Sequence, residues 1–407
     1  MRLLLVNYEY PPLGGGGGVA HRDLAEALAT RNEVTVLTTH FPSLPREERV
    51  HGVRILRVPV WGREHMPVAT LRSMVTFVPS ALLAGLRATK KNRPDLIHVF
   101  FAVPSGLPAV LLARLRRIPV VLTLIGADVF DPHPTAGIAT HRNPLVRAVV
   151  RWVIRHASAV TAISEDTKRR AVLHHGASEN ISVLPLGLVP PAPRSSESEV
   201  GPTALPAATP GNGTPWRLVT IGRLIPRKAH AELLAALALL RRTDVHLHII
   251  GSGPLLPELK ETADRLGIGP QVTFEGAATE NRKWQLLRTA DIFVSASLHE
   301  GFGIVFLEAM YAGLPIVCTD VGGQTDILRA GEHALFVPPQ RPDQLASALR
   351  VLLADPDLRK RLAEKNRHAV QSFLVQDIAA RYEALFARLT RATVSPRVLV
   401  GQLQERP

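Results

Sequence analysis

Two acidic residues in the second half of the chain have a spacing that could serve ligand binding. Glu300 and Glu308 are separated by "GFGIVFL". Gly301 and Gly303 predict that Glu300 lies on a loop and Glu308 on the following helix, whose free amides begin near Gly303. One carboxylate can then accept hydrogen bonds from a hydroxylated ligand, while the amides donate hydrogen bonds to a phosphate.

A pair of cations precedes these acids by about seventy residues. In "WRLVTIGRLIPRK", Gly222, Arg223 and Lys228 follow a predicted strand and open a predicted helix. A guanidinium and an ammonium at a helix amino terminus favour an anion site, because each charge-assisted hydrogen bond contributes about 1.5 to 3 kcal/mol. Taken alone, the motif would be interpreted as a solvated charged turn.

A run of five glycines near the amino terminus is the third candidate. In "PPLGGGGGVAHRDLA", Gly15, Gly17 and Ala20 fit the dinucleotide pattern G-x-G-x-x-A. The next strand, "EVTVLTTH", lacks the acid that would hold a ribose, and no Gly-Lys-Ser/Thr of a P-loop is present. We expect a helix from near Val19 and a flexible backbone at 15–18 that approaches phosphate or sugar, with a ligand-free loop as the alternative.

The elements that position these residues alternate regularly. Apolar runs at 2–7, 33–39, 53–59, 95–100, 119–126, 159–164 and 181–187, and again at 216–222, 245–251, 271–276, 291–297, 315–320 and 333–338, predict strands separated by crossover-sized helices. This pattern indicates an α/β fold of two doubly wound parallel sheets facing a cleft, with ligands beyond the carboxyl ends of the strands.

The domain boundaries follow from composition. We expect an amino-terminal domain at 1–188, a Pro/Ser/Gly-rich flexible linker at 189–215, a second domain at 216–375, and a carboxy-terminal helix and tail at 376–407 that returns to the first domain.

Charge and cysteine content narrow the class of protein. The net charge is +13, of which residues 1–188 contribute +10. A basic half suits an anionic partner. The single Cys318 excludes an internal disulfide, and "GLPIVCTD" predicts that Cys318 is a core residue on a strand.

The apolar segments 74–86 and 103–115 are shorter than the roughly 20 residues needed to span a bilayer. We expect a cytoplasmic protein.

The order of motifs resembles a known family. "GRLIPRK", "IIGSGP", "VTFEG", "EGFGIVFLE" and "VGG" follow one another between residues 216 and 328, and "YPPLGGGGG", "DLIHV", "LIGADV" and "AISE" occur in the first half. Together they look like the retaining glycosyltransferases of family 4, whose fold is GT-B. The resemblance implies a metal-independent transfer of a hexose from a nucleotide-diphosphate sugar, without another cofactor, to an acceptor in glycolipid, cell-envelope polysaccharide or small-glycoside synthesis.

The resemblance also implies residue roles. Arg223 and Lys228 would hold the donor diphosphate, Glu300 the sugar hydroxyls and Glu308 the ribose, and the region around Glu275 would border the base. The implied catalytic residues are Arg223, Lys228, Glu300 and Asp128. The implied donor-binding residues are Gly15, Gly16, Gly17, Gly126, Gly222, Gly276, Gly301, Phe302, Gly303, Ile304, Val305 and Glu308, with no metal ligand.

Two positions depart from the family pattern, and several alternatives stay open. Ile125 stands where many members have a histidine, and Asp326 where they often have Glu. His21 is expected either to face the cleft or to be solvated or to cap the helix.

A glycosidase is disfavoured because its reaction needs no phosphate site, so Arg223 and Lys228 would have no role. A sugar-nucleotide epimerase or phosphorylase, and a basic protein that binds nucleic acid or a membrane surface without transferase activity, remain as alternatives. We expect the basic and apolar surface at 74–93 to contact anionic lipid at the inner face of the cell membrane.

Overall fold

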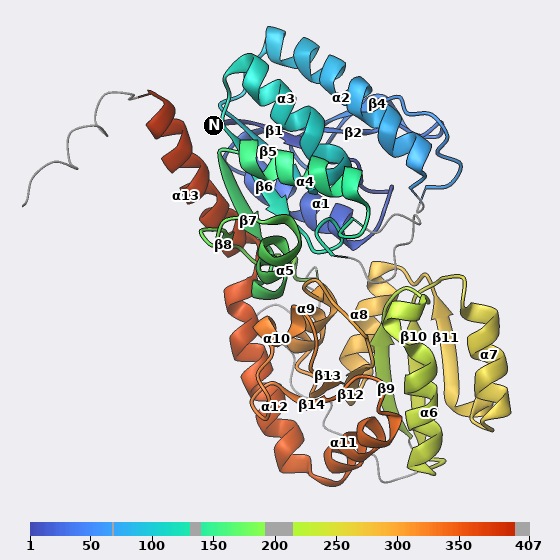
Figure 1. The fold of residues 1–407 in the computed structure, drawn as a ribbon. Helices are drawn as coiled ribbons and strands as arrows, with labels where there is room; N and C mark the ends of the chain where they lie inside the picture. Colours follow the sequence, from blue (N-terminus) through green and yellow to red (C-terminus); the bar gives the residue numbers. More distant parts are fainter. Residues whose placement is uncertain (67–68, 131–139, 192–214, 395–407) are drawn as a thin grey trace, which may run out of the picture. The chain divides into compact units, whose positions relative to one another are not determined.

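The fold is known from a computed structural model that describes residues 1–66, 69–130, 140–191 and 215–394. The chain divides into two compact units, one of Met1–Gly187 with Val375–Pro407 and the other of Leu188–Leu374 (Figure 1). These divisions lie one residue from the expected boundaries at 188 and 375. Residues 192–214 of the expected linker lie outside the described residues.

The first unit contains an eight-stranded sheet. Its order is β3-β4-β2-β1-β5-β6-β7-β8, and every pair is parallel except β3 with β4. The strands are β1 (Arg2–Val6), β2 (Glu33–Thr39), β3 (Glu47–Val50), β4 (Val53–Val58), β5 (Leu96–Phe100), β6 (Val120–Leu124), β7 (Ala159–Ala162) and β8 (Ser182–Val183). Seven of these correspond to the apolar runs expected from the sequence.

The edge strand β3 was not predicted. Its sequence, "EERV", has neither a buried run nor a clear apolar alternation. A tight turn joins it to β4, with φ of 46° at His51 and 82° at Gly52. Two successive residues with positive φ are typical of a hairpin turn, so the dipeptide His-Gly was the signal for this hairpin.

Helices cover both faces of this sheet (Figure 1). They are α1 (Gly16–Ala29), α2 (Leu71–Lys91), the irregular turn η1 (Ala102–Gly106), α3 (Leu107–Arg116), α4 (Pro144–His156), α5 (Glu165–His175) and α13 (Val375–Val394). Alternate residues of β1 face two separate cores: Leu4 and Val6 pack with residues of α2, α3 and α4, whereas Leu3 and Leu5 pack with residues of α1 and α13. This burial on both faces explains why β1 is continuously apolar after Arg2.

The carboxy-terminal helix α13 packs on the first unit, beside α1. The Tyr382 hydroxyl lies 3.2 Å from Thr123 Oγ1, and Asn32 donates to Glu383 at 2.6 Å. His21 lies in the same core: its ring is fully buried and stacks on Phe100 at 4.1 Å between centroids. The sequence prediction for His21 was therefore wrong, since the side chain is neither solvated nor directed at a ligand.

The second unit contains a six-stranded, fully parallel sheet of order β11-β10-β9-β12-β13-β14. Its strands are β9 (Trp216–Ile221), β10 (Val245–Ile250), β11 (Val272–Gly276), β12 (Ile292–Ser295), β13 (Ile316–Thr319) and β14 (Ala334–Val337). All six coincide with the expected apolar runs. Cys318 is buried in β13, as the sequence predicted.

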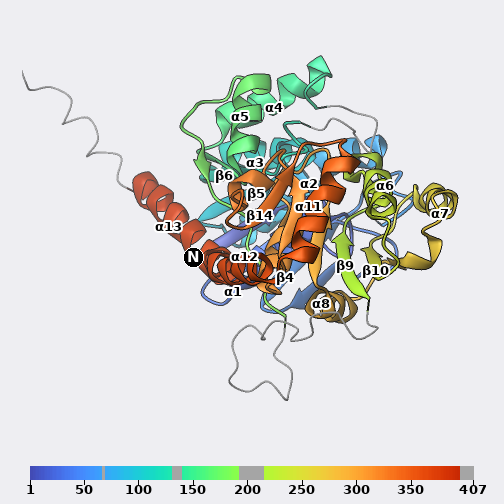
Figure 2. The same cartoon turned by 90° about the horizontal axis from the view of Figure 1, so that it is seen from below.

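The helices of the second unit pack around this sheet. They are η2 (Pro226–Lys228), α6 (His230–Leu240), α7 (Leu256–Arg265), η3 (Gly269–Gln271), α8 (Glu280–Thr289), α9 (Ile304–Tyr311), α10 (Gln324–Ile327), α11 (Pro342–Ala354), α12 (Pro356–Ala369) and η4 (Val370–Phe373). Helix α6 lies between α7 and α11 and contacts both (Figure 2).

Both sheets reverse their winding next to their first strand. In the first unit the reversal falls between β1 and β5, and in the second between β9 and β12. The crossover connections diverge at such a point and leave a crevice beyond the carboxyl ends of the two strands, where α/β proteins bind ligands. The five-glycine run follows β1, the "GRLIPRK" segment follows β9, and Glu300 follows β12.

Candidate functional site

The loops after β9 and β12 of the second unit form the candidate site. The amide of Leu298 donates to the carbonyl of Arg227 at 2.8 Å and joins the two loops. A third loop supports them from behind: a Cβ at Gly251 would lie 1.9 Å from the carbonyl oxygen of Gly222. Only glycine allows this approach. The "IIGSGP" motif therefore fixes the backbone from which the cations project.

Glu300 is the centre of the site. Its side chain is buried and accepts hydrogen bonds from Lys228 Nζ, from Ser297 Oγ at 2.8 Å and from Arg227 Nη1 at 3.3 Å. Arg227 also donates to the carbonyl of His299 at 2.5 Å. The side chain of Lys228 runs past Gly222, where an added Cβ would lie 3.3 Å from its methylenes. The structure thus places Gly222, Lys228 and Glu300 next to one another.

The charges in this cluster determine its protonation. Burial would raise the pKa of Glu300, but the positive charges of Lys228 and Arg227 outweigh it and lower that pKa to about 2. Burial lowers the pKa of Lys228, an effect that the Glu300 carboxylate opposes. Two cations on one buried carboxylate leave a net positive charge, which favours an anionic ligand.

Arg223 and Arg227 differ from expectation. Arg223 is exposed, and among the described residues it has no ion-pair partner. It is therefore available to a ligand but does not contact Glu300. Arg227, which the sequence analysis did not select, makes that contact instead. Its position next to Lys228 in "PRK" was the available signal, because a residue beside a functional lysine at a strand end shares its loop.

The turn after Glu300 is held by glycines. Gly303 has a φ of 89° and precedes the first residue of α9, so the predicted helix start is correct. The amide of Gly323 donates to the Glu300 carbonyl at 2.7 Å, and a Cβ at Gly322 would lie 2.3 Å from that oxygen. Phe302 is buried against Phe373, so its side chain is not exposed to a ligand.

Glu308 lies on α9 and belongs to a second ion-pair group. It is buried and pairs with Lys283 Nζ of α8 at 2.5 Å, and Lys283 also pairs with Glu280. Lys283 was not selected from the sequence. Nothing in the polar sequence of its helix indicates that this lysine pairs with a buried carboxylate.

The region expected to border a nucleotide base also contains an acidic side chain with basic partners. Glu275 of β11 accepts from His248 and from Arg282, and the adjacent Gly276 has a φ of 67° with open space beside it.

The glycine run in the first unit has two distinct parts. Helix α1 begins at Gly16, not near Val19, so three of the five glycines belong to the first turn of the helix. No atom lies within 4 Å of a Cβ added at Gly15 or Gly16, whereas one at Gly17 would lie 2.7 Å from Ile125 Cδ1 and 2.8 Å from Phe101 Cζ. Within the run, only Gly15 and Gly16 have open space beside the α-carbon, and the Gly15 amide donates to Glu9 Oε2 at 3.1 Å.

This division predicts opposite effects of alanine at adjacent positions. Gly17→Ala should destabilise the first unit by about 1 to 3 kcal/mol, because the methyl group overpacks the Phe101 and Ile125 side chains. Gly16→Ala, the matched control, should stabilise it by about 0.5 to 1 kcal/mol, because alanine favours a helix at an unobstructed site. Urea unfolding of both variants measures this difference; equal stabilities would contradict the packing described.

Asp128 has a different place from that expected of a catalytic residue. Its carboxylate is buried and accepts from the amides of Ala102 and Ile125, each at 3.0 Å, beside Gly126, which has a φ of 99°. Both oxygens are thus used by backbone amides of the loops that follow β5 and β6. We revise the role of Asp128 from catalysis to positioning these loops.

Asp128 also predicts a pH dependence of stability. Burial raises its pKa from 3.8 to about 6, against the opposing effect of the amide hydrogen bonds. Between these values the folded chain retains a proton that the unfolded chain has lost, so this group's contribution to stability falls as pH rises, by up to about 3 kcal/mol. The difference in unfolding free energy between the wild type and Asp128→Asn should shrink from about pH 4 to pH 7 in urea titrations. A constant difference would contradict it.

Comparisons with known proteins match both units. A family model described as "Glycosyl transferase 4-like domain" matches residues 15–187, and one described as "Glycosyl transferases group 1" matches residues 203–369. This chain is a family 4-type, group 1 glycosyltransferase. A glycogen synthase of Mycobacterium tuberculosis is 28% identical over 98% of this glycosyltransferase and 97% of its own length. A 2-deoxystreptamine glucosyltransferase of Streptomyces kanamyceticus is 26% identical over 82% and 88%.

Solved structures show the fold. A sucrose-phosphate synthase of Thermosynechococcus elongatus superposes with a TM-score of 0.77 at 23% identity, covering 96% of this glycosyltransferase and 99% of that chain. Anabaena HepE in complex with UDP-glucose gives a TM-score of 0.74 at 19% identity, covering 95% and 100%. The expected GT-B fold with two Rossmann-like domains is confirmed.

Proposed function

We propose that this glycosyltransferase transfers a hexose of the mannose, glucose or N-acetylglucosamine type from a nucleotide-diphosphate sugar, with retention of configuration and without a metal ion. The acceptor belongs to glycolipid, envelope-polysaccharide or small-glycoside synthesis. The observation that supports it most strongly is the cluster of Arg227, Lys228 and Glu300 at the winding reversal of the second sheet. It places two cations beside a carboxylate that stays ionised.

The chemistry of transfer requires stabilisation of the leaving group. As the bond between the anomeric carbon and the phosphate oxygen breaks, its electron pair stays on the diphosphate, and negative charge grows there. Lys228, Arg223 and the first amides of α9 would stabilise this charge. The acceptor oxygen forms the new bond on the same face of the sugar, and its proton passes to the departing phosphate oxygen. This route needs no nucleophile from the protein.

The two acidic residues would bind hydroxyl groups. Lys228 and Arg227 lower the pKa of Glu300 to about 2, which keeps the carboxylate ionised near neutral pH and able to accept hydrogen bonds from the transferred sugar. A glycosidase would instead need a carboxylic acid with a raised pKa. Glu308, held by Lys283, would accept from the ribose. Gly301, Gly303, Ile304 and Val305 would contribute backbone contacts.

In the first unit, the open backbone at Gly15 and Gly16 is the part of the glycine run that we propose for ligand contact. Gly17 and Gly126 support it through packing and loop conformation rather than direct contact.

The donor is tested by thermal stabilisation. GDP-mannose, UDP-glucose and UDP-N-acetylglucosamine are added separately to the full chain, and slow release of nucleoside diphosphate is followed with and without EDTA. We expect one donor to raise the melting temperature and to be hydrolysed equally in both conditions, with the α-anomer formed first. HepE was solved with UDP and with UDP-glucose, which supports including a UDP sugar.

Two results would overturn the proposal. If no sugar nucleotide stabilises the chain, the transferase function is rejected. If a sugar nucleotide is converted to its epimer, with the sugar still attached to the diphosphate in the product, the epimerase alternative is correct.

A further inference from the structure

The outward face of α2 carries apolar residues between cations. Every fourth residue, from Ser73 to Thr89, is buried against the sheet. The opposite face is exposed and contains, in order along the helix, Arg72, Val75, Pro79, Leu83, Arg87 and Lys90. Val75 is 61% exposed and Leu83 55%. A surface helix of a globular protein usually presents polar residues at such positions.

A tryptophan adjoins the start of this face. Trp61 is 80% exposed, although its amide donates to Thr76 Oγ1 of α2 at 2.9 Å. The side chain is thus held beside the helix and directed to solvent. Leu71, in the first turn of α2, is 53% exposed. Apolar rings and chains in this setting are typical of surfaces that enter a membrane interface.

A basic groove of about 600 Å³ flanks the second half of α2. Its charged lining is Arg46, Arg54, Arg57, Arg87 and Lys91. Arg54 pairs with Glu47 and Arg57 with Glu48. The remaining three cations have no ion-pair partner among the described residues. The groove therefore carries uncompensated positive charge.

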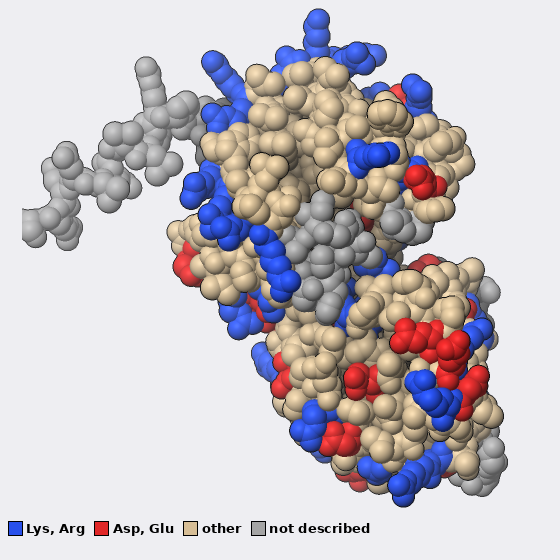
Figure 3. Space-filling model, turned by 45° about the vertical axis from the view of Figure 1, so that its right-hand side comes forward, with Lys and Arg blue, Asp and Glu red and all other residues tan. Residues whose placement is uncertain are grey.

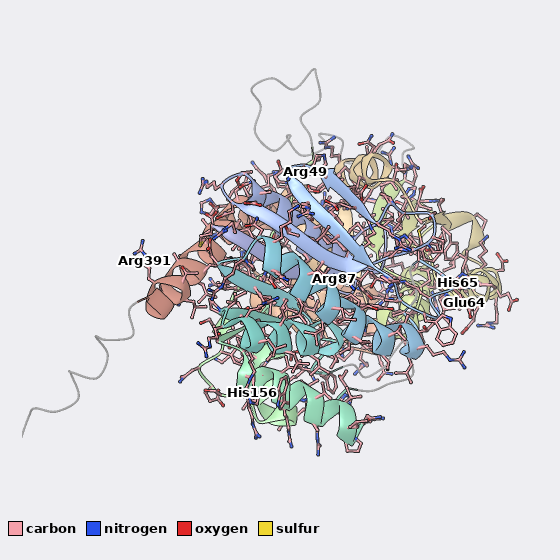
Figure 4. The ribbon with its side chains drawn as sticks, turned by 90° about the horizontal axis from the view of Figure 1, so that it is seen from above. Arg49, Glu64, His65, Arg87, His156 and Arg391 are labelled. Carbon is pink, nitrogen blue, oxygen red and sulfur yellow. The ribbon has the colours of Figure 1, made fainter. Side chains whose placement is uncertain are left out.

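The charge is uneven on a larger scale too. In the view of Figure 3 the charged side chains on the first unit are mostly Lys and Arg, whereas those on the second unit are of both signs. Figure 4 looks onto the sheet edge and α2, with Arg49 of β3 and Arg87 of α2 labelled on this side of the first unit. From Arg46 to Arg93 the sequence has ten basic residues and three acidic ones.

We propose that this surface, formed by Trp61, the exposed face of α2 and the basic groove, docks on an anionic phospholipid membrane. The groove cations without an ion-pair partner in the described part of the chain, Arg46, Arg87 and Lys91, bind headgroup phosphates, and Trp61, Val75 and Leu83 enter the boundary between headgroups and acyl chains. Cations and apolar side chains act together in such binding. Within the described ranges no helix is both long and apolar enough to cross a bilayer, so the contact is peripheral.

A lipid surface explains these residues better than a nucleic acid does. Phosphate binding alone would use the cations and leave the apolar face of α2 without a role. A single-stranded nucleic acid would need several aromatic platforms in a groove. Here one tryptophan lies beside aliphatic residues and Pro79.

The test is co-sedimentation of the full chain with phosphatidylcholine vesicles that contain or lack phosphatidylglycerol, at low and high salt. We expect binding only to the anionic vesicles and weaker binding at high salt. Each basic residue near an anionic bilayer contributes about a fivefold factor, so Arg87→Gln/Lys91→Gln should bind roughly 30-fold more weakly. The matched control, Lys360→Gln/Arg361→Gln on exposed positions of α12, should bind as the wild type does.

A second variant separates lipid from other anions. Trp61→Ala/Leu83→Ser keeps every charge and should weaken vesicle binding at least fivefold without changing the melting temperature or turnover of a water-soluble acceptor. Three results would overturn the proposal. The wild type does not bind anionic vesicles; Arg87→Gln/Lys91→Gln and Lys360→Gln/Arg361→Gln lose the same amount of vesicle affinity; or Trp61→Ala/Leu83→Ser binds vesicles as tightly as the wild type does. The chain could instead bind a single-stranded oligonucleotide, with binding weakened by Arg87→Gln/Lys91→Gln but not by Trp61→Ala/Leu83→Ser. That result would show that the surface is a nucleic-acid site and not a lipid site.

Discussion

Replacement of Lys228 by alanine should lower kcat/KM for the sugar nucleotide about 10²- to 10³-fold, the usual effect of removing one group that stabilises developing charge. Lys228 Nζ contacts Glu300 in the site and its side chain is only 12% exposed, so its charge acts with little screening. The nucleoside diphosphate alone should also bind more weakly, because the lost charge-assisted hydrogen bond contributes about 1.5 to 3 kcal/mol. Steady-state kinetics and calorimetric titration with the nucleoside diphosphate measure both effects.

The control for Lys228→Ala is Lys260→Ala, which removes an exposed lysine from α7 of the same unit. This variant should retain wild-type kinetics. Arg227 and Ser297 still bond to Glu300 when Lys228 is absent, so the fold should persist. Activity of Lys228→Ala within a few-fold of Lys260→Ala would show that this lysine does not act on the leaving group.

Replacement of Glu300 by glutamine should separate binding from turnover. The side chain keeps its shape but loses its charge, which leaves Lys228 and Arg227 without their counter-ion. Removing one partner of a buried ion pair typically costs about 3 to 5 kcal/mol of stability. The turnover number should fall about 10²- to 10³-fold, because the transferred sugar loses its ionised acceptor.

The diphosphate should offset part of this loss in Glu300→Gln. Its negative charge replaces that of Glu300 beside the two cations, so nucleoside diphosphate should raise the melting temperature of the variant by more than that of the wild type. Glu258→Gln, an exposed substitution on α7, serves as the control and should leave stability and rate unchanged. A variant that loses affinity for the nucleoside diphosphate in parallel with its turnover would contradict this charge balance.

The sequence predicted the elements of the second unit well for a physical reason. Strands β12 and β13 are buried at every position and β9 and β10 at most of theirs, so they appear as mainly apolar runs. The residues that follow β9 and β12 were therefore placed at strand ends, where Lys228 contacts Glu300 in the structure. Strand β3 was not predicted, because an edge strand need not be apolar.

What the sequence could not predict depends on contacts between distant segments. Arg227 reaches Glu300 across 73 residues, and Lys283 reaches Glu308 from a neighbouring helix. Gly15 and Gly17 are indistinguishable in the sequence, yet one is open and the other packs on Phe101 and Ile125. Asp128 was assigned to catalysis, but its oxygens are occupied by backbone amides. Residue type and spacing alone do not show whether a side chain faces a ligand or its own backbone.

The most direct measurement is the release of nucleoside diphosphate from a sugar nucleotide, followed by phosphorus NMR for the diphosphate and by proton NMR for the anomeric configuration of the sugar, with the wild type and Lys228→Ala side by side. The proposed function predicts that the wild type converts one donor to its nucleoside diphosphate and an α-configured sugar product, while Lys228→Ala does so at least a hundredfold more slowly. Release of the diphosphate at the same rate by both proteins, or by neither with any donor, would contradict it.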